Sequence, residues 1–125
     1  SIYPNWKFSL TDAIASGGLH GCLLVGKKFK VNHRTERDLT EVKIRLYKSG
    51  NFEEEGSGAN VLEGPISAIR YLHKGLAKIK NQDPLSAGDI ITTGTMTDAK
   101  LIFSKEEWSA QFDGAIRSEL NLEFL

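Results

Sequence analysis

Two groups of residues in this sequence of 125 residues could do chemistry on a small organic acid. One is the run Thr92-Thr93-Gly94-Thr95, whose hydroxyl groups and accessible amides could bind a carboxylate or a keto oxygen. The other is Lys7, directly after Trp6, whose ammonium could neutralise negative charge on a reacting group. The residues alone favour simpler interpretations, which are a turn between strands for the first and a surface lysine for the second.

A glycine-rich stretch lies upstream of the threonine run. It reads Gly56-Ser57-Gly58-Ala59-Asn60-Val61-Leu62-Glu63-Gly64-Pro65 and precedes a predicted helix. The glycine spacing differs from Gly-x-Gly-x-x-Gly, and the strand before it is charged rather than buried, so a dinucleotide-binding turn is excluded. We interpret these glycines as positions where the backbone packs closely before the helix.

These motifs resemble the carboxy-terminal half of the 2-keto-4-pentenoate hydratases, in the fumarylacetoacetate hydrolase superfamily. The glycine stretch follows the pattern Gly-x-Gly-Ala-x-Val-Leu-Gly-x-Pro, with Glu63 at a usual glycine. Gly88-Asp89 precedes the threonine run at the family's spacing. Trp6-Lys7 is similar to the family's Asp-Trp-Lys, with Asn5 in place of the aspartate, and Ser16-Gly17 stands where the family has Asp-Asn. The resemblance therefore covers nearly the whole chain, with departures at named positions.

The resemblance implies a metal-dependent hydratase, a lyase of aromatic catabolism that adds water to a 2-hydroxy-2,4-dienoate to give a 4-hydroxy-2-keto acid. Sister enzymes decarboxylate 4-oxalocrotonate or cleave acylpyruvates, and the sequence does not separate these activities. The resemblance assigns Lys7 a catalytic role and makes Thr93, Gly94 and Thr95 substrate-binding residues. It also implies Mg²⁺ or Mn²⁺, held by a Glu-x-Glu pair and a further acid that are expected upstream of Ser1.

We therefore expect residues 1–125 to form one domain, the carboxy-terminal portion of a longer hydratase-like chain, with little or no activity of its own. The alternative is a non-catalytic β-rich domain that retains the fold and serves assembly or binding. A sheet that lacks its upstream strands leaves an open edge or an apolar patch. The sequence thus predicts self-association into a homo-oligomer.

The composition restricts the partners of the chain. Sixteen basic and sixteen acidic residues cancel, so no long-range field favours nucleic acid or an anionic membrane. The basic run between Lys27 and Arg37 is interpreted as a solvated loop, and no apolar run approaches the ~20 residues of a membrane span. A single cysteine, Cys22, excludes an internal disulfide framework and is typical of a reducing, cytoplasmic compartment. The three scattered histidines do not predict a zinc site.

Hydrophobic periodicity predicts two helices. A short helix is expected over residues 9–16, and the main helix over about 65–80. The apolar residues of the main helix recur at spacings of three and four and would dock on a sheet. These residues are Ile66, Ile69, Leu72, Leu76 and Ile79. The polar segment 27–38 is interpreted as an irregular connection.

Apolar runs and alternation predict the strands. A buried strand is expected at 22–25, and a hairpin with one solvated face at 41–47 and 52–55. Short strands are expected at 90–92 and 100–103, and a terminal strand at 116–124 follows the hairpin signal Asp113-Gly114. The elements predict a β-rich α+β domain. The resemblance specifies a mixed β-sheet or roll of the fumarylacetoacetate hydrolase carboxy-terminal type with one main helix.

Overall fold

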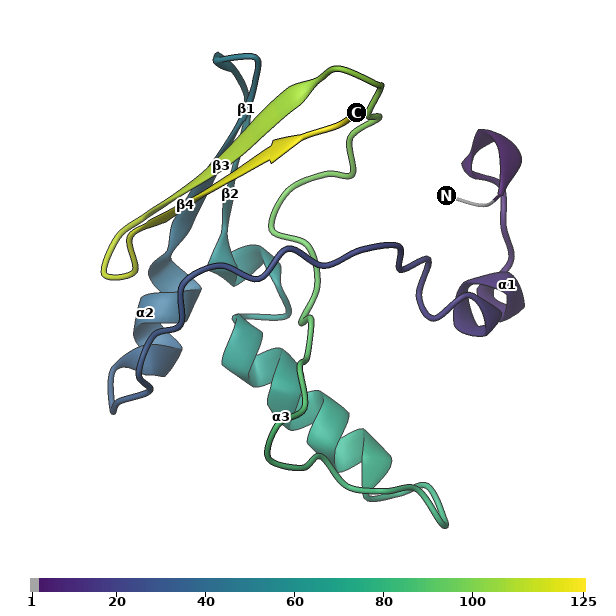
Figure 1. Ribbon diagram of the computed structural model, residues 1–125. Coiled ribbons are helices and arrows are strands. Elements are labelled where there is room, and N and C mark those ends of the chain that lie inside the picture. The colour runs from purple at the N-terminus through teal and green to yellow at the C-terminus, as the bar shows by residue number, and fades with distance from the viewer. Residues whose placement is uncertain (1–2) are drawn as a thin grey trace.

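An antiparallel sheet of four strands organises the chain, with α2 and α3 below one end of it and α1 off to one side (Figure 1). The computed structural model describes residues 3–125. The strands are β1 (Lys43–Lys48), β2 (Asn51–Ser57), β3 (Glu107–Asp113) and β4 (Ser118–Glu123), in the spatial order β2-β1-β3-β4. The helices are α1 (Leu10–Ala15), α2 (Thr35–Glu41) and α3 (Pro65–Leu76), with 3-10 turns η1 (Pro4–Trp6) and η2 (Gly58–Asn60).

Two hairpins build the sheet, and pairing between β1 and β3 joins them. The first hairpin turns at Ser49 and Gly50, both with positive φ, as a two-residue hairpin turn requires. The second turns after Asp113, where Gly114 has a φ of 129°. Both turns and the strands β1, β2 and β4 agree with the sequence prediction. Within residues 3–125 all strand pairings are antiparallel, so the expected mixed sheet is not found there, while the α+β character is confirmed.

Strand β3 is central in the sheet and is missing from the sequence prediction. It pairs with β1 so that Ile44 lies opposite Phe112 and Leu46 lies opposite Ala110. Leu120 of β4 lies opposite Ala110 on the other side of β3. These residues define one side of the sheet, which we call the inner face. The alternation of Ala110 and Phe112 with polar residues was the available signal for β3.

The inner face is covered by segments without regular structure. Gly26 lies so close to Leu120 that an added Cβ would be 2.8 Å from its Cδ2. Phe29 and Met96 line an apolar hollow of about 200 Å³ against Phe112 and Leu120. At the other end of the face, Lys48 Nζ lies 2.6 Å from Glu106 Oε1. The sheet thus carries its own small core without a covering layer of helices.

Helix α3 is confirmed, but its packing differs from the prediction. Pro65 opens it as expected, and it ends at Leu76, about four residues earlier than predicted. Its main neighbour is α2, where Arg70 donates two hydrogen bonds to the carboxylate of Glu36. Gly64 allows this approach, because a Cβ there would clash with the Thr40 hydroxyl. Docking of this helix on the sheet, as predicted from its apolar stripe, is therefore wrong.

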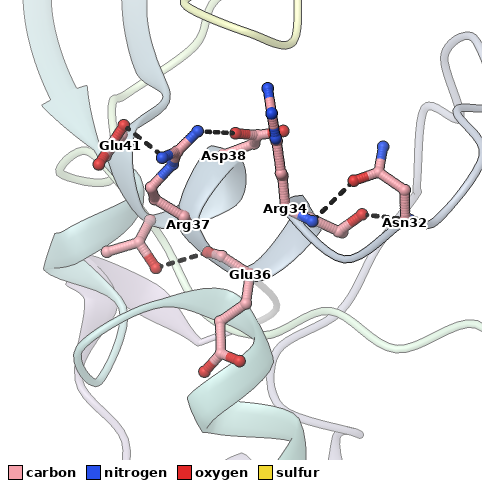
Figure 2. A network of polar contacts seen from close by, with 8 residues as sticks. Asn32, Arg34, Glu36, Arg37, Asp38 and Glu41 are labelled. Atoms are coloured by element: carbon pink, nitrogen blue, oxygen red, sulfur yellow. Dashed lines mark hydrogen bonds and ion pairs between the residues drawn. The ribbon is translucent and has the colours of Figure 1, made fainter.

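Helix α2 also corrects the sequence prediction, which made residues 27–38 irregular. Figure 2 shows Arg37 between two carboxylates, those of Asp38 and Glu41, at 3.7 and 3.9 Å. Glu36 points away from them toward α3 (Figure 2), and the Arg70 guanidinium lowers the pKa of this carboxyl. Part of the basic run is thus paired within the chain.

Three predicted strands are absent from the described part of the chain. Residues 22–25, 90–92 and 100–103 have no regular secondary structure and no strand pairing. Cys22 and the apolar residues after it are exposed, so the predicted buried strand is wrong. An apolar run specifies a strand only where a neighbouring strand supplies hydrogen-bond partners. The sheet ends at β2 and β4, which leaves these three segments unpaired.

The chain exposes more surface than a compact protein of its mass. Its accessible area is 9811 Å², whereas a compact monomer of 13.8 kDa exposes roughly 6,600 Å². Among residues 3–125, the buried apolar side chains are those of Val42, Ile44 and Val61, together with Pro65 at the start of α3. In contrast, Leu10 and Ile14 of α1 are 78% and 71% exposed. Among residues 3–125, no helix combines the length and apolarity that a bilayer crossing needs.

Candidate functional site

The predicted substrate-binding residues Thr93, Gly94 and Thr95 form a segment without regular structure, which we call the threonine segment. It follows a turn in which Ser86 donates its backbone N–H to the Asp89 carboxylate at 2.7 Å. This confirms the turn predicted at Gly88-Asp89. Gly94 has a φ of 121°, and an added Cβ would lie 3.3 Å from Val61 Cγ1. Glycine at position 94 therefore satisfies both the backbone conformation and a close approach.

Side chains of the first hairpin and of η2 hold the residues after the threonine segment. Asn60 donates from Nδ2 to the Met96 carbonyl oxygen at 2.9 Å. The backbone N–H of Asp98 donates to Glu54 Oε1 at 3.1 Å, and Lys100 Nζ lies 2.5 Å from Glu54 Oε2. Hydrogen bonds from Lys100 and from the Asp98 backbone lower the pKa of Glu54. The carboxylate is therefore held in its charged form.

Lys7, the predicted catalytic residue, lies in an exposed stretch between η1 and α1. It belongs to an N-terminal arm, residues 3–25, that leaves the sheet and extends to one side (Figure 1). Within the arm, Trp6 packs edge-on against Phe8 at 5.6 Å between ring centroids. Asn5 and Trp6 both have positive φ, a conformation that costs more for tryptophan than for asparagine. The arm thus has local order around Lys7.

Two open hollows lie between the N-terminal arm and residues 90–101. One, of about 780 Å³, is lined by residues 3–6 of the arm and by residues 99–101. The other, of about 550 Å³, is lined by residues 17–23 together with Ile90 and Thr92. Residues 3–6 thus face residues 99–101, while residues 17–23 face Ile90 and Thr92. The N-terminal arm and the segment 90–101 therefore run in opposite directions. The residues next to Lys7 in the chain and those next to the threonine segment therefore lie on the same side of the molecule.

The structure does not bring the predicted site residues into contact through these hollows. Trp6 lines the first hollow, but Lys7 lines neither. Thr92 lines the second, whereas Thr93, Gly94 and Thr95 do not. Helix α1 makes few contacts with other elements, so little in the described chain fixes the distance between Lys7 and the threonine segment. The assigned roles of Lys7 and the threonine segment stay predictions.

The described residues do not fit a divalent cation. Among residues 3–125, no group of three or more His, Cys, Asp or Glu side chains is arranged to hold a metal ion. Two of the three glutamates of β2 form ion pairs instead: Glu54 with Lys100, and Glu55 with Arg45 Nε at 2.9 Å. Residues 3–125 alone therefore provide no donor set for Mg²⁺ or Mn²⁺.

Sequence reasoning missed Glu54, Asn60 and Lys100 as contributors to the site. The sequence pattern placed Glu54 in the hairpin strand 52–55 and Lys100 in a short strand at 100–103, with no role in a site. Their pairing joins residues 46 positions apart, and no local pattern signals such a contact. The nearby glycines were the available clue, because they mark close backbone approach.

Comparison with known proteins agrees with the motif-based resemblance. No protein-family model matches the chain. The chain is 24% identical to 2-keto-4-pentenoate hydratase 1 of Dechloromonas aromatica (strain RCB) and 28% identical to the 4-oxalocrotonate decarboxylase of Pseudomonas putida. Each match covers 91% of this chain and 42% of the relative. The chain thus spans less than half the length of these relatives.

Solved structures give the same result. The 4-oxalocrotonate decarboxylase from Pseudomonas putida G7 is similar in two complexes, one with magnesium and adipate and one with calcium and acetate. The TM-scores are 0.64 and 0.63 at 27% identity, over 70% of this chain and 32% of the other. The predicted resemblance to the 2-keto-4-pentenoate hydratases and their decarboxylase relatives is confirmed.

Proposed function

We propose that this chain is the carboxy-terminal portion of a lyase that acts on small 2-keto or 2-hydroxydienoic acids. The preferred reaction is addition of water to a 2-hydroxy-2,4-dienoate, which gives a 4-hydroxy-2-keto acid. Decarboxylation of 4-oxalocrotonate and cleavage of an acylpyruvate are related reactions of the same substrate class. The observation that supports the proposal best is the similarity to both hydratases and decarboxylases over 91% of the chain.

In this proposal the threonine segment binds the acid. The hydroxyls of Thr93 and Thr95 and the amides around Gly94 donate hydrogen bonds to the carboxylate and the keto oxygen. Glycine at 94 lets the ligand approach the backbone, since no side chain projects there. A half-buried Thr93 beside an exposed Thr95 suits a ligand that enters from solvent and is partly desolvated.

Lys7 has the electrostatic role. When the proton of the enol leaves the substrate oxygen, negative charge develops on that oxygen, and an ammonium nearby stabilises it. The arm has to bring Lys7 close to the threonine segment for this to occur. We propose that polypeptide outside this sequence fixes the arm and supplies the carboxylates for Mg²⁺ or Mn²⁺, because residues 3–125 do not fit the cation.

The test is binding of 2-oxopentanoate, a stable 2-keto acid, followed by NMR on the isotope-labelled chain. We expect saturable shifts of the amides of residues 93–95, with millimolar affinity and no turnover. Thr93→Val and Thr95→Val should each weaken binding several-fold, while Thr11→Val in α1 serves as the matched control. Shifts that do not saturate, or that fall only outside the threonine segment, would contradict the proposal.

A second function is favoured by the exposed surface. The chain exposes 9811 Å², and the excess over a compact monomer is of the size buried in large permanent interfaces, roughly 2,000–5,000 Å². A non-catalytic domain used for assembly would show this feature without binding a keto acid. Both functions imply association, and we propose that the isolated chain forms homo-oligomers. Light scattering should show a mass above that of the monomer at high concentration, and a monomer throughout would contradict this.

A further inference from the structure

We infer that Glu54 and Asn60 are positioning residues that hold the threonine segment in its substrate-binding arrangement. Neither residue reaches the segment itself; each holds backbone immediately after it. The inference rests on the proposed function, because it gives these residues a role in recognition of the keto acid. The inference also gives the glycine-rich stretch a role in positioning the threonine segment, in addition to the close backbone packing that its glycines indicate.

The first step is the contact made by Asn60. This residue ends η2, a turn that is capped at its start by Ser57, whose Oγ accepts from the Ala59 N–H at 3.3 Å. Asn60 Nδ2 then donates to the carbonyl oxygen of Met96, the residue that follows Thr95. That carbonyl belongs to the same peptide unit as the Thr97 N–H. The orientation of the backbone after Thr95 is therefore fixed by one side-chain amide.

The second step is the close approach that a glycine permits. Gly56 of β2 is buried, and a Cβ at this position would clash with the Met96 carbonyl oxygen. It would also lie 2.9 Å from Thr97 Cγ2. The backbone of residues 96–97 thus lies directly against the inner face of the sheet, at strand β2.

The third step is the charged clamp at Glu54. The two carboxylate oxygens of Glu54 have different partners. Oε1 accepts the hydrogen bond from the Asp98 backbone N–H, and Oε2 forms the ion pair with Lys100 Nζ. The side chains of Glu54 and Lys100 are 23% and 30% exposed, so water screens the pair only in part. Asn60, Gly56 and Glu54 therefore hold residues 96–100 along a continuous line, and Gly94 against Val61 extends this line into the threonine segment.

The chemical consequence is a preformed set of donors. Binding of a small acid by hydroxyls and amides is efficient only when the donors need not be ordered at the moment of binding. On the preceding side, Ile90 is 71% exposed, and the hydrogen bonds of the turn at residues 86–89 are local to that turn. The order of the threonine segment thus comes from its carboxy-terminal side, where Glu54 and Asn60 act.

The experiment compares Asn60→Ala and Glu54→Gln in the full chain by NMR hydrogen exchange, without ligand. Glu54→Gln keeps an acceptor for the Asp98 N–H but removes the charge that attracts Lys100. We expect amide exchange at residues 95–98 to be about tenfold faster in each variant, because Asn60→Ala removes one hydrogen bond and Glu54→Gln removes the charge that strengthens the contacts of Glu54 with Asp98 and Lys100. Asn51→Ala and Glu55→Gln are matched controls, because both residues belong to β2 and their side chains have hydrogen-bond partners elsewhere, the Ser49 carbonyl oxygen and Arg45.

A second measurement separates positioning from general stability. Chemical unfolding followed by tryptophan fluorescence should be nearly unchanged in both variants, while the dissociation constant for 2-oxopentanoate should rise several-fold. Asn60→Ser, which restores a shorter donor, should recover part of the affinity and serves if Asn60→Ala does not fold. Unchanged exchange at residues 95–98 would overturn the inference whatever the ligand does. Faster exchange together with no binding of 2-oxopentanoate by the unmodified chain would instead overturn the proposed function alone.

Discussion

The sheet and the N-terminal arm both carry apolar side chains at regular spacing, yet only the sheet buries them. Ile44 of β1 is 9% exposed, whereas Ile14 of α1 is 71% exposed. The difference lies in the partners that the chain provides. Strand β1 has a hydrogen-bonded neighbour on each side, while α1 makes few contacts with any other element. A pattern therefore gives an element its apolar face, but a second element is needed to bury that face.

The sharpest test of this comparison replaces the same residue type in both regions. Ile44→Ala should lower the free energy of unfolding by about 2–5 kcal/mol, because it leaves a cavity in the small core on the inner face of the sheet. Ile14→Ala should change it by less than about 0.5 kcal/mol in the monomer, as expected for an exposed position. Urea unfolding measures both. An equal loss in the two variants would show that the arm is packed in solution.

The next effect concerns glycines that permit close approach. Gly58 allows the Leu39 carbonyl oxygen to lie where a Cβ would be, so Gly58→Ala should cost about 1–3 kcal/mol through a forced backbone shift. Gly75 in α3 has no atom within 4 Å of an added Cβ. Gly75→Ala should therefore stabilise the protein by about 0.5–1 kcal/mol, since alanine is the better helix former. Thermal unfolding of the two variants should shift in opposite directions.

A smaller, local effect is expected in the arm. Ser9 caps α1 in a reciprocal arrangement, in which the Ser9 hydroxyl oxygen accepts from the Asp12 N–H and Asp12 accepts from the Ser9 N–H. Ser9→Ala should cost this helix about 1 kcal/mol, enough to unwind six residues that are marginal alone. NMR shifts of α1 should move to coil values. The unfolding midpoint of the sheet should stay constant, and a shift of that midpoint would show that the two regions are coupled.

The smallest effect is a dependence on pH at the Glu54 clamp. The folded pKa of this carboxyl lies below its ordinary value of 4.5, because Lys100 and the Asp98 backbone donate to it. Its contribution is complete above the ordinary value and is lost as the pH falls through the lowered one. Glu54→Gln should therefore flatten the decline of stability below about pH 4.5. Glu53→Gln removes a carboxylate from the same strand as a control, and equal curves for both variants would contradict the prediction.

Much of the secondary structure could be predicted because its causes are local. Alternating residues gave β1 and β4, the positive φ at Gly50 and Gly114 follows from turn chemistry, and Pro65 marks the start of α3. The errors share a different cause. The strands expected at 22–25, 90–92 and 100–103 need partners, and the four strands of the sheet do not supply them.

The candidate site likewise contains residues that the sequence could identify and residues that it could not. Thr93, Gly94, Thr95 and Lys7 came from motif resemblance, and their roles stay predictions. The roles of Glu54 and Asn60 could not be predicted from the sequence, because their contacts join β2 and η2 to residues about 40 positions away. Nothing in the local sequence of a charged strand indicates which distant backbone amide donates a hydrogen bond to one of its glutamates.

By itself, the sequence determined the hairpin turns, the starts of α1 and α3, and the resemblance to hydratases and decarboxylases, since these depend on residue types at short spacings. Only the tertiary structure decided that β3 lies at the centre of the sheet, that α3 packs on α2, and that Glu54 and Lys100 meet. The physical reason is that burial and ion pairing depend on which segments the whole chain brings together. An exposed residue such as Ile14 of α1 would be a core residue if a neighbouring element covered it.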